Sequence, residues 1–287
     1  MTAALIAIAL ICALPVMSAE SKNNNTLASI HSDQIITYKT VKTEKGTFDL
    51  KLHVFQPEKP GRKRPCIVMF HGGGWINGAP TSCYGGARRR TKQGVVCVAV
   101  EYRIRSKHGG TPLDSVRDAK SAMRWVRSHA DELGVDPERI AASGGSAGGH
   151  LAAACATLSA FNEEGEDASV SCVPNALLLN SPVLDNGLNG GYGHYHKAIR
   201  QHWKDFSPFH NIGKSMPPTL LSVGDNERKH LRIEIVQELK KKIEALGSTC
   251  EVIVLKGATH YKKTEENREM LGKATNEFLK SLGYIAE

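Results

Sequence analysis

Apolar and polar residues alternate along two segments early in the chain, residues 35–42 and 48–55. The segment Glu44-Lys45-Gly46 between them has the composition of a turn. Alternation with a period of two is typical of a strand with one buried face, and two such strands joined by a glycine-containing turn predict a hairpin. We therefore expect an exposed antiparallel hairpin ahead of the main part of the fold.

Later in the chain, short and continuous apolar runs alternate with longer segments of helical character. A continuous apolar run is typical of a strand that is covered on both faces. Such strands are predicted at residues 65–70, 94–100, 139–143, 176–179, 219–223 and 251–255. Helices are predicted at residues 84–93, 114–133, 150–156, 233–246 and 266–282. Strands that alternate with helices favour an α/β fold, with a mostly parallel sheet covered by helices on both faces.

The length of 287 residues suits one large α/β domain, which we place at residues 34–287. Within it, residues 184–216 contain glycine, asparagine, histidine and aromatic residues without a clean period. This pattern predicts a small cap-like insertion, which we place over the functional site.

The first residues of the chain form an apolar run that is followed by Pro15 and then by Ser18-Ala19. The run is short for a membrane span and fits the apolar part of a secretory signal peptide. We expect a signal peptide at residues 1–19, a disordered leader at residues 20–33, and hence a secreted or periplasmic protein. No lysine or arginine precedes the run, so an uncleaved anchor is the alternative.

The formal net charge of the chain is +8. A basic balance can favour acidic polysaccharides or anionic surfaces, although a generally basic soluble protein is the simpler interpretation. The clusters Arg62-Lys63-Arg64 and Arg88-Arg89-Arg90 are short, and they lack the interleaved aromatic residues of a nucleic-acid platform. We expect no nucleic-acid partner and no stable membrane partner, and the charge leaves the oligomeric state open.

Cysteine spacing argues against a zinc site, because no CxxC pair occurs. We expect at most one disulfide in the exported protein. Cys155 and Cys172 are the best pair, since one lies on the helix from residue 150 and the other enters the next strand. Cys66 and Cys97 lie within predicted strands and should remain buried thiols.

Histidines gather in the predicted insertion. We interpret them as solvated or substrate-lining side chains rather than metal ligands, and we expect neither a metal nor another cofactor. These histidines are His194, His196, His202 and His210.

The sequence Gly144-Gly145-Ser146-Ala147-Gly148 has the spacing G-x-S-x-G. In this pattern a serine sits on a sharp turn between a strand and a helix, and glycines such as Gly144 and Gly148 leave room for the crowded backbone. The predicted strand at 139–143 precedes the motif and the predicted helix at 150–156 follows it. Ser146 is therefore a candidate nucleophile of a serine hydrolase.

The sequence His71-Gly72-Gly73-Gly74-Trp75 directly follows the predicted strand at 65–70. Three consecutive glycines allow backbone N–H groups to approach a substrate oxygen, as an oxyanion hole requires. The alternatives are a simple tight loop or a phosphate loop, and no G-x-G-x-x-G spacing supports the latter.

A serine nucleophile needs a histidine base and an acid that orients the histidine. His260 follows the predicted strand at 251–255, and it comes last in the order serine, acid, histidine that this arrangement uses. Two carboxylates, Asp225 and Glu227, follow the strand at 219–223. The spacing alone leaves open which of them is the acid.

Taken together, these motifs resemble those of α/β-hydrolases of the hormone-sensitive-lipase-like group, and among them secreted bacterial acetyl esterases and acetylxylan-esterase-like proteins. The resemblance runs from about Lys51 to Leu282. Besides the glycine motifs, it rests on residues 118–127, 145–153, 207–210 and 217–220.

The resemblance implies Ser146 as the nucleophile, His260 as the base, and oxyanion N–H groups from Gly73, Gly74 and Ala147. The family places its acid at the fourth position of a Gly-Thr-x-Asp turn, where this chain has Glu227; Asp225 is the alternative. The implied function is hydrolysis of short-acyl carboxylic esters through an acyl-enzyme, for example acetyl groups on polysaccharide. An amide hydrolase or peptidase with the same triad, and a non-catalytic binding protein of this fold, are the alternatives.

Overall fold

The computed structural model describes residues 30–59, 61, 63–187, 197–213, 216–227, 231 and 233–286. The predicted signal peptide and most of the predicted leader lie outside these residues, as do His194 and His196. Within the described part of the chain, no helix has both the length and the apolar character needed to cross a membrane.

The fold is built on an eight-stranded sheet in the order β1-β2-β4-β3-β5-β6-β7-β8. β1 pairs with β2, and β2 with β4, in antiparallel orientation, whereas the pairs from β4 to β8 are all parallel. The strands are β1 (Gln34–Thr43), β2 (Gly46–Phe55), β3 (Arg64–Phe70), β4 (Val96–Val100), β5 (Val135–Gly145), β6 (Ala176–Asn180), β7 (Thr219–Gly224) and β8 (Cys250–Leu255). The predicted hairpin and the predicted mostly parallel sheet are both confirmed.

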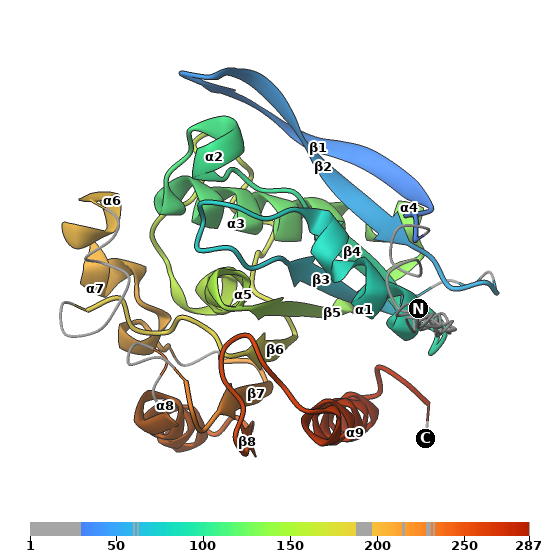
Figure 1. Cartoon of the computed structure of the whole chain (residues 1–287). Helices are drawn as coiled ribbons and strands as arrows, with labels where there is room; N and C mark the ends of the chain where they lie inside the picture. The colour runs from blue at the N-terminus through green and yellow to red at the C-terminus, as the bar shows by residue number, and fades with distance from the viewer. Residues whose placement is uncertain are drawn as a thin grey trace, which may run out of the picture. The chain divides into compact units, whose positions relative to one another are not determined.

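Helices cover both faces of this sheet, as the alternating pattern predicted. α1 and α9 lie on one side of it, and α3, α5 and α8 lie on the other (Figure 1). The longer helices are α1 (Tyr84–Thr91), α3 (Pro112–Ser128), α5 (Ala147–Thr157), α8 (Ile233–Ala245) and α9 (Glu265–Ser281). The short elements are η1 (Pro80–Cys83), α2 (Arg105–His108), α4 (Ala130–Leu133), α6 (Lys197–Arg200), α7 (Trp203–Phe206) and η3 (Pro208–His210).

The helix predicted at 114–133 differs from the observed structure, because it is divided into α3 and α4. It begins earlier, at Pro112, since Thr111 and Asp114 form a reciprocal capping box at its N-terminus. It is interrupted at His129, whose backbone leaves the helical region and whose ring nitrogen bonds to the carbonyl of Trp125. The ring of His129 stacks on the indole of Trp125.

The described part of the predicted insertion packs against the nucleophile-bearing side of the sheet. His150, on α5, donates from Nε2 to the carbonyl of Phe206 at 2.8 Å and stacks on the Phe206 ring. Trp75 contacts both of these rings edge-on. Burial lowers the pKa of His150 to about 4, so its imidazole is neutral at pH 7. The prediction that the insertion lies over the site also concerns residues 188–196, which lie outside the described residues.

The six described cysteines are free, including Cys155 and Cys172, so the predicted pairing is not formed. The thiol of Cys172 instead lies 3.7 Å from the carbonyl oxygen of Cys155, in hydrogen-bonding geometry. Both residues are buried, as are Cys66 and Cys97.

A buried ion cluster attaches the N-terminal hairpin to the rest of the fold. Asp118, on α3, is fully buried and accepts from the backbone N–H, Nε and Nη2 of Arg103 at 2.7–2.9 Å. It also accepts from Nζ of Lys39, on β1, at 2.8 Å. Both cations also contact Glu163. One carboxylate thus holds together β1, the segment after β4, and α3.

Replacing Asp118 with Asn should lower the free energy of unfolding by about 3–5 kcal/mol, because it leaves buried cations without their main partner. The measurement is urea unfolding followed by tryptophan fluorescence. Glu265→Gln is the control, since Glu265 pairs with Arg268 on an exposed face where ion pairs contribute little. Equal stability of the two variants would contradict the role given to the cluster.

Candidate active site

Ser146 lies at the turn between β5 and α5, with its backbone in a conformation that L-residues rarely adopt. Its φ is 54° and its ψ is −123°. A non-glycine residue held in such a region is strained, and the strain persists only where the surrounding structure enforces it. The turn places the Ser146 hydroxyl at the carboxyl end of the parallel strands, where open α/β sheets bind ligands.

The two glycines of the motif are required by close packing around this turn. A Cβ atom on Gly148 would lie 2.1 Å from the carbonyl oxygen of Phe70, at the end of β3. A Cβ atom on Gly144 would lie 2.3 Å from the backbone of Gly148. Both distances are far inside van der Waals contact, so the sequence motif follows from the approach of α5 to the ends of β3 and β5.

The glycine loop after β3 forms the opposite side of the site. Gly73 and Gly74 both have positive φ, 121° and 63°, and a Cβ on Gly73 would lie 2.0 Å from the carbonyl oxygen of Asn77. Together with Gly72 they line the pocket around Ser146. Ala147 is the first residue of α5, so its N–H has no partner within the helix. The positive end of that helix adds to the field at this point.

His71 packs in the core behind the glycine loop and does not line the pocket. It is buried, stacks on Tyr102 with ring centroids 4.2 Å apart, and its carbonyl accepts from the Tyr102 hydroxyl at 2.6 Å. Burial lowers the pKa of His71 to about 4. A neutral, buried imidazole of this kind holds the loop in position.

Ser146, His260 and Glu227 form a continuous chain of polar contacts. The Ser146 hydroxyl lies 2.9 Å from Nε2 of His260. On the other side of the ring, Nδ1 lies 3.2 Å from Oε2 of Glu227. The side chains of His260 and Glu227 are 9% and 3% exposed, so water is largely excluded from their contact. The order nucleophile, base and acid matches the arrangement required for serine catalysis.

The structure pairs Glu227, and not Asp225, with the histidine. Asp225 instead accepts a hydrogen bond from the backbone N–H of Gly257 at 2.7 Å, at an exposed position. It therefore stabilises the loop that leads to His260. Burial alone would raise the pKa of Glu227, but the contact with His260 and the hydrogen bond from Ser181 lower it below its ordinary value, so the group is ionised at pH 7.

Ser181 is a residue of the site that the sequence analysis missed. Its hydroxyl donates to Oε1 of Glu227 at 2.6 Å, which leaves Oε2 to face His260. Ser181 is buried and its φ is 43°, a second strained position. The available signal was its place directly after β6, since the carboxyl ends of neighbouring parallel strands meet at one edge of the sheet.

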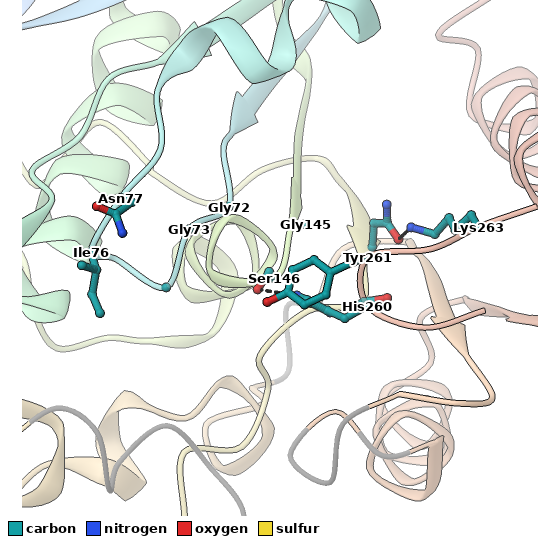
Figure 2. A pocket seen from close by; sticks show the side chains of 12 residues that line it. Gly72, Gly73, Ile76, Asn77, Gly145, Ser146, His260, Tyr261 and Lys263 are labelled. Atoms are coloured by element: carbon teal, nitrogen blue, oxygen red, sulfur yellow. Dashed lines mark hydrogen bonds between the residues drawn. The ribbon is translucent and has the colours of Figure 1, made fainter. Parts of the chain in front are cut away.

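These residues open into a cavity of about 510 Å³. Figure 2 shows Ser146 and His260 at its centre, with Ile76 and Asn77 towards one side and Tyr261 and Lys263 towards the other. The remaining described lining is Gly72, Gly73, Gly74, Gly145, Asn180 and Ser181. A cavity of this volume is in the usual range for small-molecule sites.

Metal-ligating side chains do not cluster in the described part of the chain: no group of three or more His, Cys, Asp or Glu residues has suitable geometry. Of the histidines predicted for the insertion, His210 lies 3.3 Å from Asp185 and His202 has an edge-on ring contact with Phe161.

Comparison with known proteins places these features in a family. The BD-FAE family model matches residues 52–177. Carboxylesterase NlhH of Mycobacterium tuberculosis is 36% identical over 115 residues, which are 39% of this chain and 35% of that protein. A probable isoprenylcysteine alpha-carbonyl methylesterase of Arabidopsis thaliana, ICMEL1, is 27% identical over 238 residues, covering 73% of this chain and 48% of that protein. The chain thus matches between a third and a half of the length of these relatives.

A solved structure matches nearly the whole fold. Esterase 2 of Thermogutta terrifontis is 34% identical, with a TM-score of 0.79, and the match covers 88% of this chain and 96% of that one. The chain belongs to the esterases of the α/β-hydrolase family, the carboxylic-ester hydrolases whose motifs it resembles.

Proposed function

We propose that the protein hydrolyses carboxylic esters of short acyl groups through an acyl-enzyme on Ser146. The observation that carries the proposal is the contact chain from Ser146 through His260 to Glu227, which opens into a cavity of about 510 Å³. A serine hydroxyl is a poor nucleophile unless an adjacent base accepts its proton, and His260 is in position to do so.

The first half of the reaction forms the acyl-enzyme. As Oγ of Ser146 attacks the ester carbonyl carbon, Nε2 of His260 accepts the hydroxyl proton. The N–H groups of Gly73, Gly74 and Ala147 stabilise the oxyanion of the tetrahedral intermediate. When the intermediate collapses, the bond to the alcohol oxygen breaks and Nε2 donates its proton to that oxygen.

The second half releases the acid. Water attacks the acyl carbon while Nε2 of His260 accepts one of the water protons. The bond from the acyl carbon to Oγ of Ser146 then breaks, Nε2 donates that proton to Oγ, and the carboxylic acid leaves. The Glu227 carboxylate keeps a hydrogen on Nδ1 and stabilises the imidazolium in both halves, while Ser181 positions the carboxylate. No metal or other cofactor takes part in these steps.

The proposed preference for short acyl groups is supported by a similar protein of known structure. Esterase 2 of Thermogutta terrifontis has been solved with propionate and with butyrate bound, acids of three and four carbons. The same protein has been solved phosphorylated by paraoxon. For this chain, acetyl groups on polysaccharide are a candidate substrate by family resemblance, in keeping with the predicted secreted or periplasmic location. The basic net charge suits an acidic polysaccharide.

The wild-type protein should hydrolyse p-nitrophenyl esters with kcat/KM highest for acetyl to butyryl groups and falling towards decanoyl. Ser146→Ala should lower kcat by about 10⁶, because only binding and oxyanion stabilisation remain. Acetylated xylan and a p-nitroanilide are measured alongside. A folded Ser146→Ala variant with a tenth of the wild-type rate would exclude the serine mechanism, and faster turnover of the anilide would favour an amide hydrolase.

Glu227→Gln should lower kcat by about 10⁴ on p-nitrophenyl acetate, because the imidazole loses the charge that orients and stabilises it. Asp225→Asn is the matched control, since it removes a carboxylate two residues away whose hydrogen bond in the described chain is to the loop backbone at Gly257. It should keep most of the rate. The reverse ranking of the two variants would show that the acid is Asp225.

A further inference from the structure

The cavity beside His260 contains a charged side chain that the proposed reaction does not use. Lys263 lines the cavity on the same loop as His260 and is half-buried (Figure 2). Among the described lining residues it is the one side chain of lysine, arginine, aspartate or glutamate type. The cavity therefore presents one positive charge and no negative charge from these residues.

The ammonium group of Lys263 has unused capacity for hydrogen bonding. It donates to Oδ1 of Asn180 at 3.0 Å, and it makes no ion pair with a carboxylate of the described chain. An ammonium group has three donors, so two of them have no partner among the described residues. The carboxylate of Glu227, whose charge acts on Lys263, already contacts Ser181 and His260.

Partial burial of the Lys263 ammonium group costs free energy unless an anion pairs with it. Partial desolvation lowers the pKa of Lys263, and the more distant Glu227 charge only partly opposes this. A hydrogen bond from an ammonium group to a carboxylate is about twice as strong as one between neutral groups. A neutral hydroxyl group would therefore satisfy the donors less well than a carboxylate.

We propose that Lys263 binds a carboxylate on the alcohol part of the substrate, so that the preferred substrates are short-acyl esters of hydroxy acids. This inference rests on the proposed ester hydrolysis and names its substrate class. The alcohol side is assigned because His260 must lie against the leaving oxygen in order to protonate it. Lys263 lines the cavity beyond His260, on the side opposite Ile76 and Asn77 (Figure 2), and it is therefore assigned to the group attached to that oxygen.

The test compares two acetate esters that differ in one charge: 4-acetoxybenzoate and its neutral analogue 4-acetoxybenzamide. The ratio of their kcat/KM values is measured for wild type, Lys263→Met, Lys263→Arg and Lys262→Met. Comparing ratios between variants cancels the different reactivity of the two leaving groups. Lys262→Met is the matched control, because Lys262 is exposed and does not line the cavity.

The ratio should fall about tenfold in Lys263→Met, as expected for loss of a charge-assisted hydrogen bond at a partly solvated site. Lys263→Arg should keep most of the preference, and Lys262→Met should keep all of it. Added salt should lower the wild-type ratio but leave that of Lys263→Met unchanged. An equal loss of rate on both esters in Lys263→Met, or the same change of ratio in Lys262→Met, would overturn the assignment.

A second pair of esters tests the alcohol side. Monophenyl succinate carries its carboxylate on the acyl group, and phenyl butyrate is its neutral analogue. The ratio of the kcat/KM values of these two esters should change less than threefold between wild type and Lys263→Met. A change larger than that of the acetoxy pair would show that the anion site lies on the acyl side. If wild type hydrolysed none of the four esters, the proposed ester hydrolysis itself would be wrong. If wild type hydrolysed the charged and the neutral esters with equal kcat/KM, only the proposed role of Lys263 would be wrong.

Discussion

The site depends on one packing constraint, the close approach of α5 to the end of β3. At that point the backbone of Gly148 lies so near the Phe70 carbonyl that a Cβ atom would be 2.1 Å from it. The chain reaches this position from β5 through a very sharp turn. Ser146 lies in that turn and has the strained backbone conformation, with positive φ, that the turn requires. The same contact sets α5 next to the glycine loop, so Ser146 and the three glycines of the loop line one cavity.

The remaining side chains of the site follow β6, β7 and β8, the strands that lie on the side of β5 away from β3. Because β5 to β8 are parallel, the segments after β6, β7 and β8 meet at one edge of the sheet and bring Ser181, Glu227 and His260 together. Glutamate is longer than aspartate by one methylene group. The Ser181 hydroxyl limits that extra freedom by holding one carboxylate oxygen, which leaves the other for His260.

Much of this could be predicted from the sequence, because the elements follow from short-range patterns. Apolar runs identified the strands, and the glycine spacings located the turn at Ser146 and the loop of Gly72, Gly73 and Gly74 that lines the cavity. The interruption of the predicted 114–133 helix at His129 was missed, since it depends on a side chain that bonds to its own helix. The choice between Asp225 and Glu227 was left to family resemblance, and Ser181 was missed, because both depend on contacts between loops far apart in the sequence. The predicted Cys155–Cys172 disulfide was wrong because proximity along the fold does not fix sulfur geometry.

The central claim is that Ser146 is a nucleophile activated by the fold, and covalent labelling tests it most directly. The native protein is treated with paraoxon, digested, and analysed by mass spectrometry. The account predicts one diethylphosphoryl group per chain, on the peptide that contains Ser146, with no label in Ser146→Ala or in protein unfolded before treatment. Labelling of another residue, or ester hydrolysis that persists in a chain without label, would contradict it.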